Sequence, residues 1–301
     1  MYSLSTSWNS FRHKSGDELV GEIKSIGFDT IELNFAMTES MVKDILALTQ
    51  RSEIKVSSLH NICPLPAEIG LDEASPDYYS LASPDEEERE LAVGVAKNTI
   101  RYARMFGAKA VVLHAGRVQI KDRMRELAAL TGDTEAFNAL KAQMIRERDE
   151  KKGGYLDNVI KSLAELVPYA SQMKVLLGIE NRYYYREIPL IDELEAIFNN
   201  FNSGEVFYWH DAGHAEVFDR LGITKHEDLL ERFANRLIGV HLHDIMGVMD
   251  DHKPPGLGTF DFRILKPYLK KDTIKVIEAH HPATANQIRK GAEYLKKIFG
   301  A

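Results

Sequence analysis

Histidine and carboxylate side chains recur along this chain directly after short runs of apolar residues. Seven residues make up this set: His60, His114, Glu180, Asp211, His214, His241 and Glu278. A single buried histidine is usually a hydrogen-bonded core residue, but buried carboxylates are costly unless they are paired or bound to a metal ion. Mixed imidazole and carboxylate donors suit Zn²⁺, Mn²⁺, Co²⁺ or Fe²⁺ better than Ca²⁺. The set therefore predicts a divalent metal site, provided that the fold brings these side chains together.

A second group of polar residues lies in the segment 250–262, which also holds two prolines and two glycines. Asp250 and His252 are two positions apart, and extended backbone places such a pair on one side of the chain. They could hold a further metal ion or a substrate oxyanion. The alternative is a capped turn that leads into a helix beginning near Asp261.

The apolar runs that precede these residues are expected to be β-strands. Eight runs qualify: 2–7, 30–35, 56–61, 110–115, 176–182, 206–211, 239–244 and 274–280. Several are almost continuously apolar, which is typical of a strand that is buried on both faces. A strand of this kind belongs to a parallel sheet with helices packed over it.

Amphipathic stretches separate the expected strands. They cover 17–25, 40–49, 85–106, 155–169, 190–199, 225–234 and 286–299. Gly27, Gly107 and Gly239 are expected to end helices just before the next strand, because glycine tolerates the left-handed conformation found there. The repeated order of strand, helix, glycine and strand predicts a (β/α)₈ barrel, in one domain over residues 1–301.

Two of the connections are longer than one strand-and-helix unit needs. Residues 64–84 are rich in proline and acidic residues and are expected to form an irregular loop, whereas 117–154 is a highly charged helical excursion after strand 4. Both follow strand carboxyl ends, where barrels build their active sites, so they are candidates for a lid or a wall. The alternative for 141–152 is a helix that is merely solvated.

Composition excludes several classes of protein. The 301 residues carry 38 Lys and Arg against 45 Asp and Glu, a net charge of −7, so there is no overall attraction to nucleic acid or anionic membranes. Cys63 is the single cysteine, which rules out an intramolecular disulfide framework and a cysteine-rich metal site. No apolar run approaches the roughly 20 residues that span a bilayer, and no signal peptide is evident, so a cytoplasmic location is expected.

The polar motifs in combination resemble the xylose isomerase-like barrel superfamily. The resemblance covers almost the whole chain and rests on Glu180-Asn181-Arg182, Asp211-Ala212-Gly213-His214, His241-Leu242-His243-Asp244, the loop 250–258 and Glu278. This superfamily includes sugar isomerases and epimerases and the endonuclease IV family of apurinic-site nucleases. In its sugar-handling members the resemblance implies one metal ion held by Glu180, Asp211, His241 and Glu278, with His214 in contact with the substrate. The endonuclease IV pattern implies two or three metal ions, with His60, His114, His214, Asp250 and His252 as additional ligands.

The first functional hypothesis is a metal-dependent isomerase or epimerase of a small sugar, polyol or sugar phosphate. The metal ion would stabilise an enediolate, while Glu180 and Glu278 move the proton and His214 positions a hydroxyl group. Candidate substrate-binding residues are Arg117, Arg182 and Arg186, which could grip a phosphate or carboxylate, and Tyr184, from an aromatic segment that could wall a small pocket.

The alternative hypothesis is an endonuclease IV-like multinuclear zinc phosphodiesterase that uses all nine candidate ligands. A nucleic acid partner is less expected, because the loop 35–39 is short and is uncharged until Glu39, so it could hardly insert into a DNA duplex. A non-catalytic sugar-binding barrel is a third hypothesis, disfavoured by the cost of idle buried carboxylates. The sequence leaves the metal, the substrate and the oligomeric state open.

Overall fold

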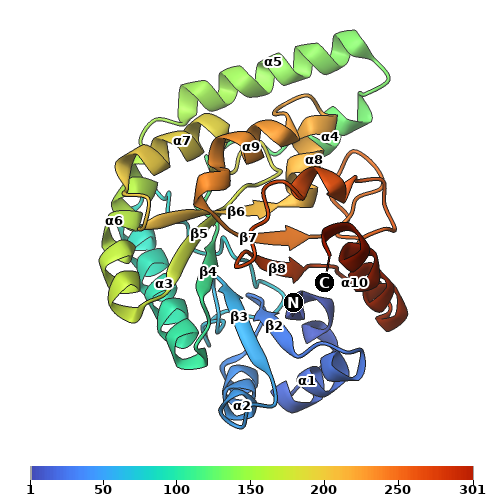
Figure 1. The fold of residues 1–301 in the computed structure, drawn as a ribbon. Helices are drawn as coiled ribbons and strands as arrows, with labels where there is room; N and C mark the ends of the chain where they lie inside the picture. The colour runs from blue at the N-terminus through green and yellow to red at the C-terminus, as the bar shows by residue number, and fades with distance from the viewer. Residues whose placement is uncertain (1, 301) are drawn as a thin grey trace.

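Eight parallel strands close into a barrel in the computed structural model, which describes residues 2–300 (Figure 1). The strands are β1 (Ser3–Ser5), β2 (Thr30–Leu33), β3 (Lys55–His60), β4 (Ala110–Leu113), β5 (Leu176–Glu180), β6 (Val206–Asp211), β7 (Leu237–Leu242) and β8 (Ile274–Ile277). Each strand pairs in parallel with the next along the chain, and β8 pairs with β1 to close the barrel. The predicted (β/α)₈ fold is therefore confirmed.

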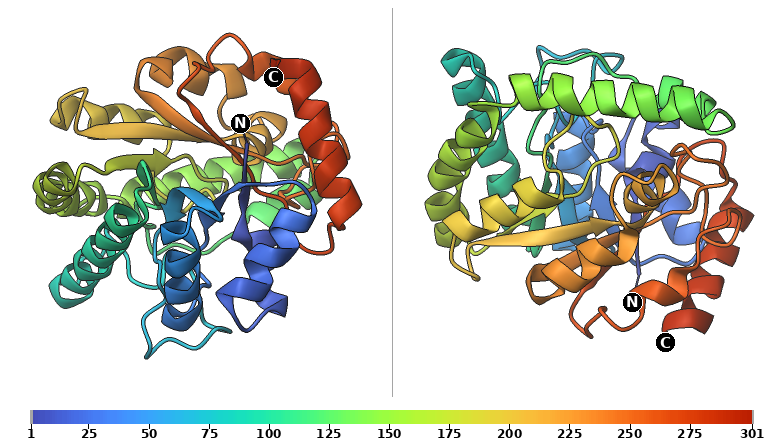
Figure 2. Two further views of the ribbon diagram at one scale, coloured as in Figure 1. Left: turned by 60° about the horizontal axis from the view of Figure 1, so that its bottom comes forward. Right: turned by 90° about the horizontal axis from the view of Figure 1, so that it is seen from above.

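The α-helices surround this barrel (Figure 2). They are α1 (Gly16–Ser25), α2 (Glu39–Gln50), α3 (Glu86–Phe106), α4 (Met124–Ala129), α5 (Thr134–Lys151), α6 (Tyr155–Met173), α7 (Ile191–Asn200), α8 (Ala212–Arg220), α9 (His226–Phe233) and α10 (Ala285–Phe299). None of the helices within residues 2–300 is long and apolar enough to cross a membrane.

Two of the predicted helix boundaries are wrong. The segment after Asp261 forms only the short 3₁₀ turn Phe262–Leu265, since Pro267 has no N–H group with which to extend a helix. In contrast, α6 continues beyond 169 to Met173 in spite of Pro168. Buried side chains on both sides of Pro168 hold the helix against the core, so tertiary packing outweighs the local cost of the proline.

The inward-facing side chains of the strands change from apolar to polar along the barrel axis. The apolar part consists of Ala110, Val112, Trp209, Ile274 and Val276. Gly239 makes room for this packing, because a Cβ atom there would lie 2.1 Å from Cζ3 of Trp209. Gly239 thus lies inside β7 and does not end a helix, contrary to the prediction. Three of these apolar residues are followed, two positions later in the chain, by a polar residue: His114 after Val112, Asp211 after Trp209 and Glu278 after Val276.

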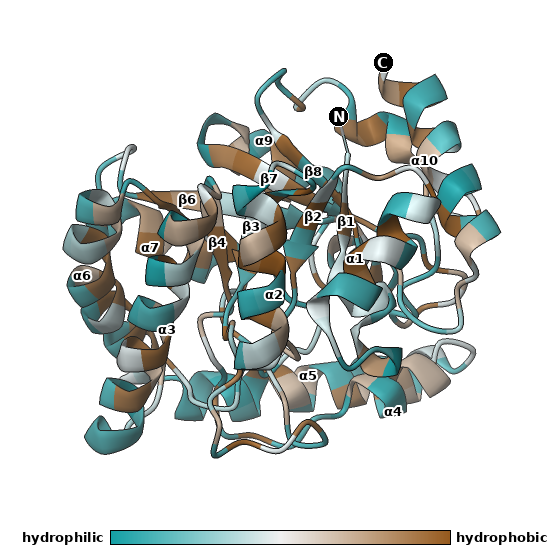
Figure 3. Ribbon diagram, turned by 90° about the horizontal axis from the view of Figure 1, so that it is seen from below, coloured by the Kyte–Doolittle hydropathy of each residue, from teal (hydrophilic) through white to brown (hydrophobic). Residues whose placement is uncertain are grey.

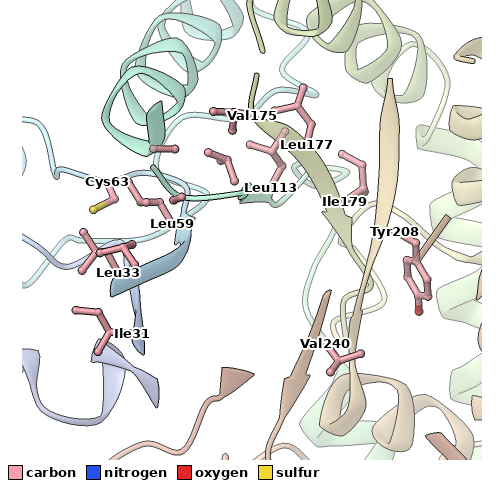
Figure 4. Close-up of a cluster of buried hydrophobic side chains, with 14 of the residues drawn as sticks. Ile31, Leu33, Leu59, Cys63, Leu113, Val175, Leu177, Ile179, Tyr208 and Val240 are labelled. Atoms are coloured by element: carbon pink, nitrogen blue, oxygen red, sulfur yellow. The ribbon is translucent and has the colours of Figure 1, made fainter. Parts of the chain in front are cut away.

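The outward-facing side chains of the strands form the main hydrophobic core with the helices. Figure 4 shows members of this layer on neighbouring strands, including Ile31, Leu33, Leu113 and Ile179, all fully buried. The helices turn their apolar faces toward it and their polar faces outward (Figure 3). Because both faces of the strands are buried, the strand ends are held rigidly and can position a site.

The two long connections follow β3 and β4. Residues 64–84 form turns and bends, whereas 117–154 contains α4 and α5, which lie across one end of the barrel (Figure 3). Arg148 fixes α5 in place, because its buried guanidinium donates hydrogen bonds to the backbone oxygens of Tyr185 and Glu187 and to the carboxylate of Glu193. This helix is therefore anchored to the segment after β5 and is not merely solvated.

Candidate metal centre

Four of the predicted ligands converge at the carboxyl ends of β5 to β8, and we call them the central cluster: Glu180, Asp211, His241 and Glu278. Nδ1 of His241 lies 2.6 Å from Oε1 of Glu180, 3.0 Å from Oε2 of Glu278 and 3.6 Å from Oδ2 of Asp211. All four side chains are buried. Three carboxylates and one imidazole within one buried site form a donor set that suits a divalent transition metal.

The first flanking cluster lies on the side of β3 and β4 and comprises His60, His114 and Glu180. Oε2 of Glu180 is 2.7 Å from Nε2 of His114 and 3.8 Å from Nε2 of His60. The same oxygen accepts a hydrogen bond of 2.6 Å from Nη1 of Arg182. A guanidinium cation therefore already balances the carboxylate that this cluster shares with the central cluster.

The second flanking cluster lies on the opposite side and comprises His214, His243, Asp250 and His252. Nδ1 of His252 is 2.6 Å from Oδ2 of Asp250. The rings of His243 and His252 stack with their centroids 4.0 Å apart, and His280 stacks on the other face of His252 at 3.8 Å. His252 also groups with Glu278 and His280, so this cluster adjoins the central one.

Charge and burial push the pKa values of the two glutamates apart. Burial alone would raise the pKa of Glu180, but the positive charges of Arg182 and His241 outweigh it and hold that pKa well below its ordinary value. At Glu278 burial dominates and raises the pKa, with the neighbouring carboxylates Glu180 and Glu32 adding to the effect. The site therefore holds one carboxylate that ionises readily and one that retains a proton more readily.

Two further carboxylates contact the outer nitrogens of two candidate ligand histidines, and neither was predicted from the sequence. Oε1 of the fully buried Glu32 is 2.9 Å from Nε2 of His241, and Oδ2 of Asp77 is 3.2 Å from Nδ1 of His114. Metal-binding histidines commonly use the second ring nitrogen in this way, which fixes the ring and its tautomer. Glu32 could have been found from the sequence, because an acidic residue within an otherwise apolar strand is unusual. Asp77 lies in an irregular loop, where the sequence contains no comparable signal.

His243 and His280 were also not assigned to the site from the sequence. His243 is fully buried and His280 partly exposed. His243 stands two residues after His241, just past the end of β7, and in extended backbone this spacing puts both side chains on the same side of the chain. The spacing of two residues was therefore a signal in the sequence for His243.

The predicted substrate-binding residues lie around the first flanking cluster and the segment after β5. Arg182 is engaged by Glu180 and Glu187, and Arg186 lies over the ring of Tyr184 with its guanidinium carbon 5.8 Å from the ring centroid. The aromatic ring beside the histidines is that of Tyr183, 4.6 Å from His214.

Arg117 lies near Asp77 in the same region. Burial raises the pKa of Asp77, but His114, Arg182 and Arg117 together lower it to about 2. Arg117 therefore contributes to the positive potential around the first flanking cluster.

The residues present fit a bound metal ion. Nε2 of His214 and Nδ1 of His243 are buried but have no hydrogen-bond partner, which is costly for a polar atom unless another ligand satisfies it. Burial lowers the pKa of His214 to about 3, so its imidazole is neutral and available as a ligand. A divalent cation is the partner that such donors would accept.

The comparisons with known proteins agree with this architecture. The family described as xylose isomerase-like TIM barrel matches residues 20–298. This chain therefore belongs to the xylose isomerase-like TIM barrel family.

Individual relatives are more distant. An uncharacterized protein of Sinorhizobium fredii is 26% identical over 175 residues, or 58% of this chain and 47% of that protein. An uncharacterized protein of Methanocaldococcus jannaschii is 25% identical over 200 residues, or 66% of this chain and 65% of that protein. The chain thus spans about half to two thirds of the length of these curated relatives.

Solved structures resemble the whole chain at low sequence identity. A D-tagatose 3-epimerase-like protein has a TM-score of 0.70 and 20% identity and covers 99% of this chain and 96% of its own. The apo form of 3-keto-D-glucoside 4-epimerase from E. coli has a TM-score of 0.68 and 15% identity, covering 98% of both chains. The IolI protein with a bound zinc atom has a TM-score of 0.66 and 15% identity, covering 100% of this chain and 99% of that chain. At these identities the likeness concerns the fold.

Proposed function

We propose that this chain is a divalent-metal-dependent isomerase or epimerase that acts on a small sugar, polyol or sugar phosphate. The observation that carries the proposal is the placement of Glu180 and Glu278. These carboxylates come from strands that are not neighbours, yet they lie 2.6 and 3.0 Å from the same nitrogen, Nδ1 of His241. Two carboxylates from separate strands within one buried metal-type site can remove a proton from a carbon and return it.

The roles of the two glutamates follow from their surroundings. A metal ion in the central cluster would polarise a carbonyl oxygen of the substrate and stabilise the negative charge that develops on it. Glu180, with its low pKa, is ionised and is assigned the removal of the proton from the neighbouring carbon. Glu278, with its raised pKa, is assigned its return. Burial of both groups keeps bulk water away from the carbon that loses its proton.

The other substrate contacts are proposed from the groups that the site leaves available. Arg182 is already paired with Glu180 and Glu187, whereas Nε of Arg186 is buried without a hydrogen-bond partner. We therefore assign a substrate phosphate or carboxylate to Arg186, together with Arg117, and a sugar face to the aromatic wall that includes Tyr184. His214 turns Nε2 toward Asp250, so we place it in the second flanking cluster and not against a substrate hydroxyl.

A multinuclear phosphodiesterase is the second candidate. It is favoured by the presence of all nine expected ligands in the three clusters. Against it stands Arg182, which lies 2.6 Å from Oε2 of Glu180, the oxygen that a metal ion in the first flanking cluster would need. Because arginine stays protonated in proteins, its charge opposes a cation at that position.

The test is exchange of a substrate carbon-bound hydrogen with solvent. The metal-loaded full chain is incubated in D₂O with ketoses and their phosphates, and deuterium incorporation is followed by NMR. We expect exchange with at least one of these substrates, its loss in Glu278→Gln, and normal exchange in the control Glu293→Gln, whose side chain is exposed on α10. Hydrolysis of a phosphodiester or of abasic-site DNA, without exchange into any sugar, would refute the isomerase proposal in favour of the second candidate.

A further inference from the structure

The second flanking cluster contains one donor more than the resemblance to endonuclease IV supplies. That pattern accounts for His214, Asp250 and His252, and the structure adds His243 from the segment just after β7. One donor atom from each of the four residues lies within 4.8 Å of all the others. The number of protein ligands decides whether such a site keeps an open position for water or substrate.

The orientation of His243 is that of a metal ligand. Its Nε2 lies 2.9 and 3.1 Å from the two carboxylate oxygens of Asp211 and donates its hydrogen there. In the neutral ring, which is the form that binds a metal ion, Nδ1 carries the lone pair; this nitrogen is buried without a hydrogen-bond partner and lies 3.4 Å from Oδ1 of Asp250. A carboxylate that fixes one ring nitrogen while the other faces the cluster is the usual arrangement around metal-binding histidines.

A second unpartnered nitrogen points into the same cluster from α8. Nε2 of His214 is buried without a hydrogen-bond partner and lies 3.7 Å from Oδ2 of Asp250, while Nδ1 of the same ring is 3.1 Å from the backbone oxygen of Asn181. The ring of Tyr183 covers His214. Two buried imidazole nitrogens without a hydrogen-bond partner thus face the carboxylate of Asp250, and this donor set suits a divalent cation.

We propose that the second flanking cluster is a closed, structural metal site that binds zinc or a similar divalent ion through four protein ligands, with His243 as the fourth. Four protein ligands complete the tetrahedral coordination of a structural zinc, whereas catalytic zinc sites commonly have three and an open position. The metal ion would fasten the segment 250–252 to α8 and to the segment just after β7.

The remainder of the same loop is already fastened by Asp244. Its carboxylate accepts hydrogen bonds from the backbone N–H groups of Ile245, Gly256 and Phe260. The metal site would therefore complete the attachment of a loop whose far end is held without metal. Such a site is independent of sugar chemistry, and an enzyme with one catalytic metal ion would then hold two metal ions per chain.

The test measures metal content and coordination in the full-length protein. We expect the Zn²⁺-loaded wild type to retain two metal ions per chain by elemental analysis after dialysis, with one released slowly to a colorimetric chelator. Co²⁺ in the slow site should give the intense visible absorption of four-coordinate cobalt. His243→Asn should lose the slow phase, with affinity at that site weakened by about 100-fold or more, since even changes around a ligand cost 10–100-fold.

The matched control is His226→Asn, which changes another fully buried histidine. Its two ring nitrogens face His210 and Glu216, outside all the clusters, so the slow site should be unchanged. Unchanged release kinetics and cobalt absorption in His243→Asn would overturn the proposal and leave His243 as a hydrogen-bond donor to Asp211. If the variant does not fold, the wild type still decides, because one metal ion per chain, or weak cobalt absorption in the slow site, refutes a closed four-ligand site.

Discussion

The two flanking clusters have similar donors but differ in the charge placed among them. In the first, Nη1 of Arg182 is 2.6 Å from the glutamate oxygen that His114 also faces. In the second, the same guanidinium lies 3.4 Å from Nδ1 of His214, the nitrogen directed away from the cluster. At separations of a few ångströms two unit charges repel by about 4 kcal/mol, even at an effective dielectric constant of about 20. Ligand type alone thus does not decide where a metal ion binds, because a fixed cation can occupy its place.

The largest expected effect comes from removing the carboxylate that joins the first flanking cluster to the central one. Glu180→Gln should lower kcat/KM for proton exchange by about 10³-fold or more and weaken the central metal ion, because a ligand and the proposed base are lost together. Isotope exchange and elemental analysis measure the two effects. If the variant keeps both its rate of proton exchange and its central metal ion, Glu180 has no role in the mechanism. Glu293→Gln is the control for the change of charge.

Arg182→Met tests the comparison most directly. Methionine fills similar space without the charge, so the first flanking cluster should bind zinc roughly 100-fold more tightly, in line with about 3 kcal/mol of relieved repulsion. Titration followed by elemental analysis should detect one additional metal ion per chain. An unchanged metal content would mean that the arginine does not distinguish the two clusters.

Asp250→Ala tests the other side of the comparison with a smaller expected effect on turnover. It removes a ligand of the second flanking cluster, which in the proposed isomerase only holds a loop, so proton exchange should fall by about 10-fold. A phosphodiesterase that needs every ligand should instead lose its hydrolysis altogether. Parallel assays of exchange and phosphodiester hydrolysis in the same preparation separate these outcomes.

The smallest expected effect is on the pH dependence of metal-free protein. Burial lowers the pKa of His114, but Asp77 and Glu180 outweigh burial and Arg182 and raise it to about 9 from 6.5. A group with a raised folded-state pKa stabilises fully below the unfolded value and loses that contribution as pH rises. The urea midpoint in the presence of a chelator should therefore fall between about pH 6.5 and 9. His114→Gln should flatten this dependence, and an equally steep fall in that variant would place its origin elsewhere.

Strand positions were predictable from sequence because several strands are buried on both faces and therefore appear as nearly continuous apolar runs. The positions of His114, Asp211 and Glu278 at strand ends were also predictable, because these residues stand at the ends of the apolar runs. Gly239 was wrongly predicted to end a helix. A glycine is needed there because the ring of Trp209, on another strand, leaves no room for a Cβ atom. A local sequence pattern carries no information about such a contact.

The sequence by itself determined the barrel and the presence of imidazole and carboxylate groups at one end of it, since strand burial and side-chain alternation are local properties. Only the tertiary structure decided how these groups divide into three clusters. In the first flanking cluster the guanidinium of Arg182 contacts Glu180, and in the second flanking cluster a nitrogen of His243 has no hydrogen-bond partner. The fold also brings Glu32 from β2 to His241 on β7. These relations join residues that are far apart in the chain, and their distances depend on how all eight strands close.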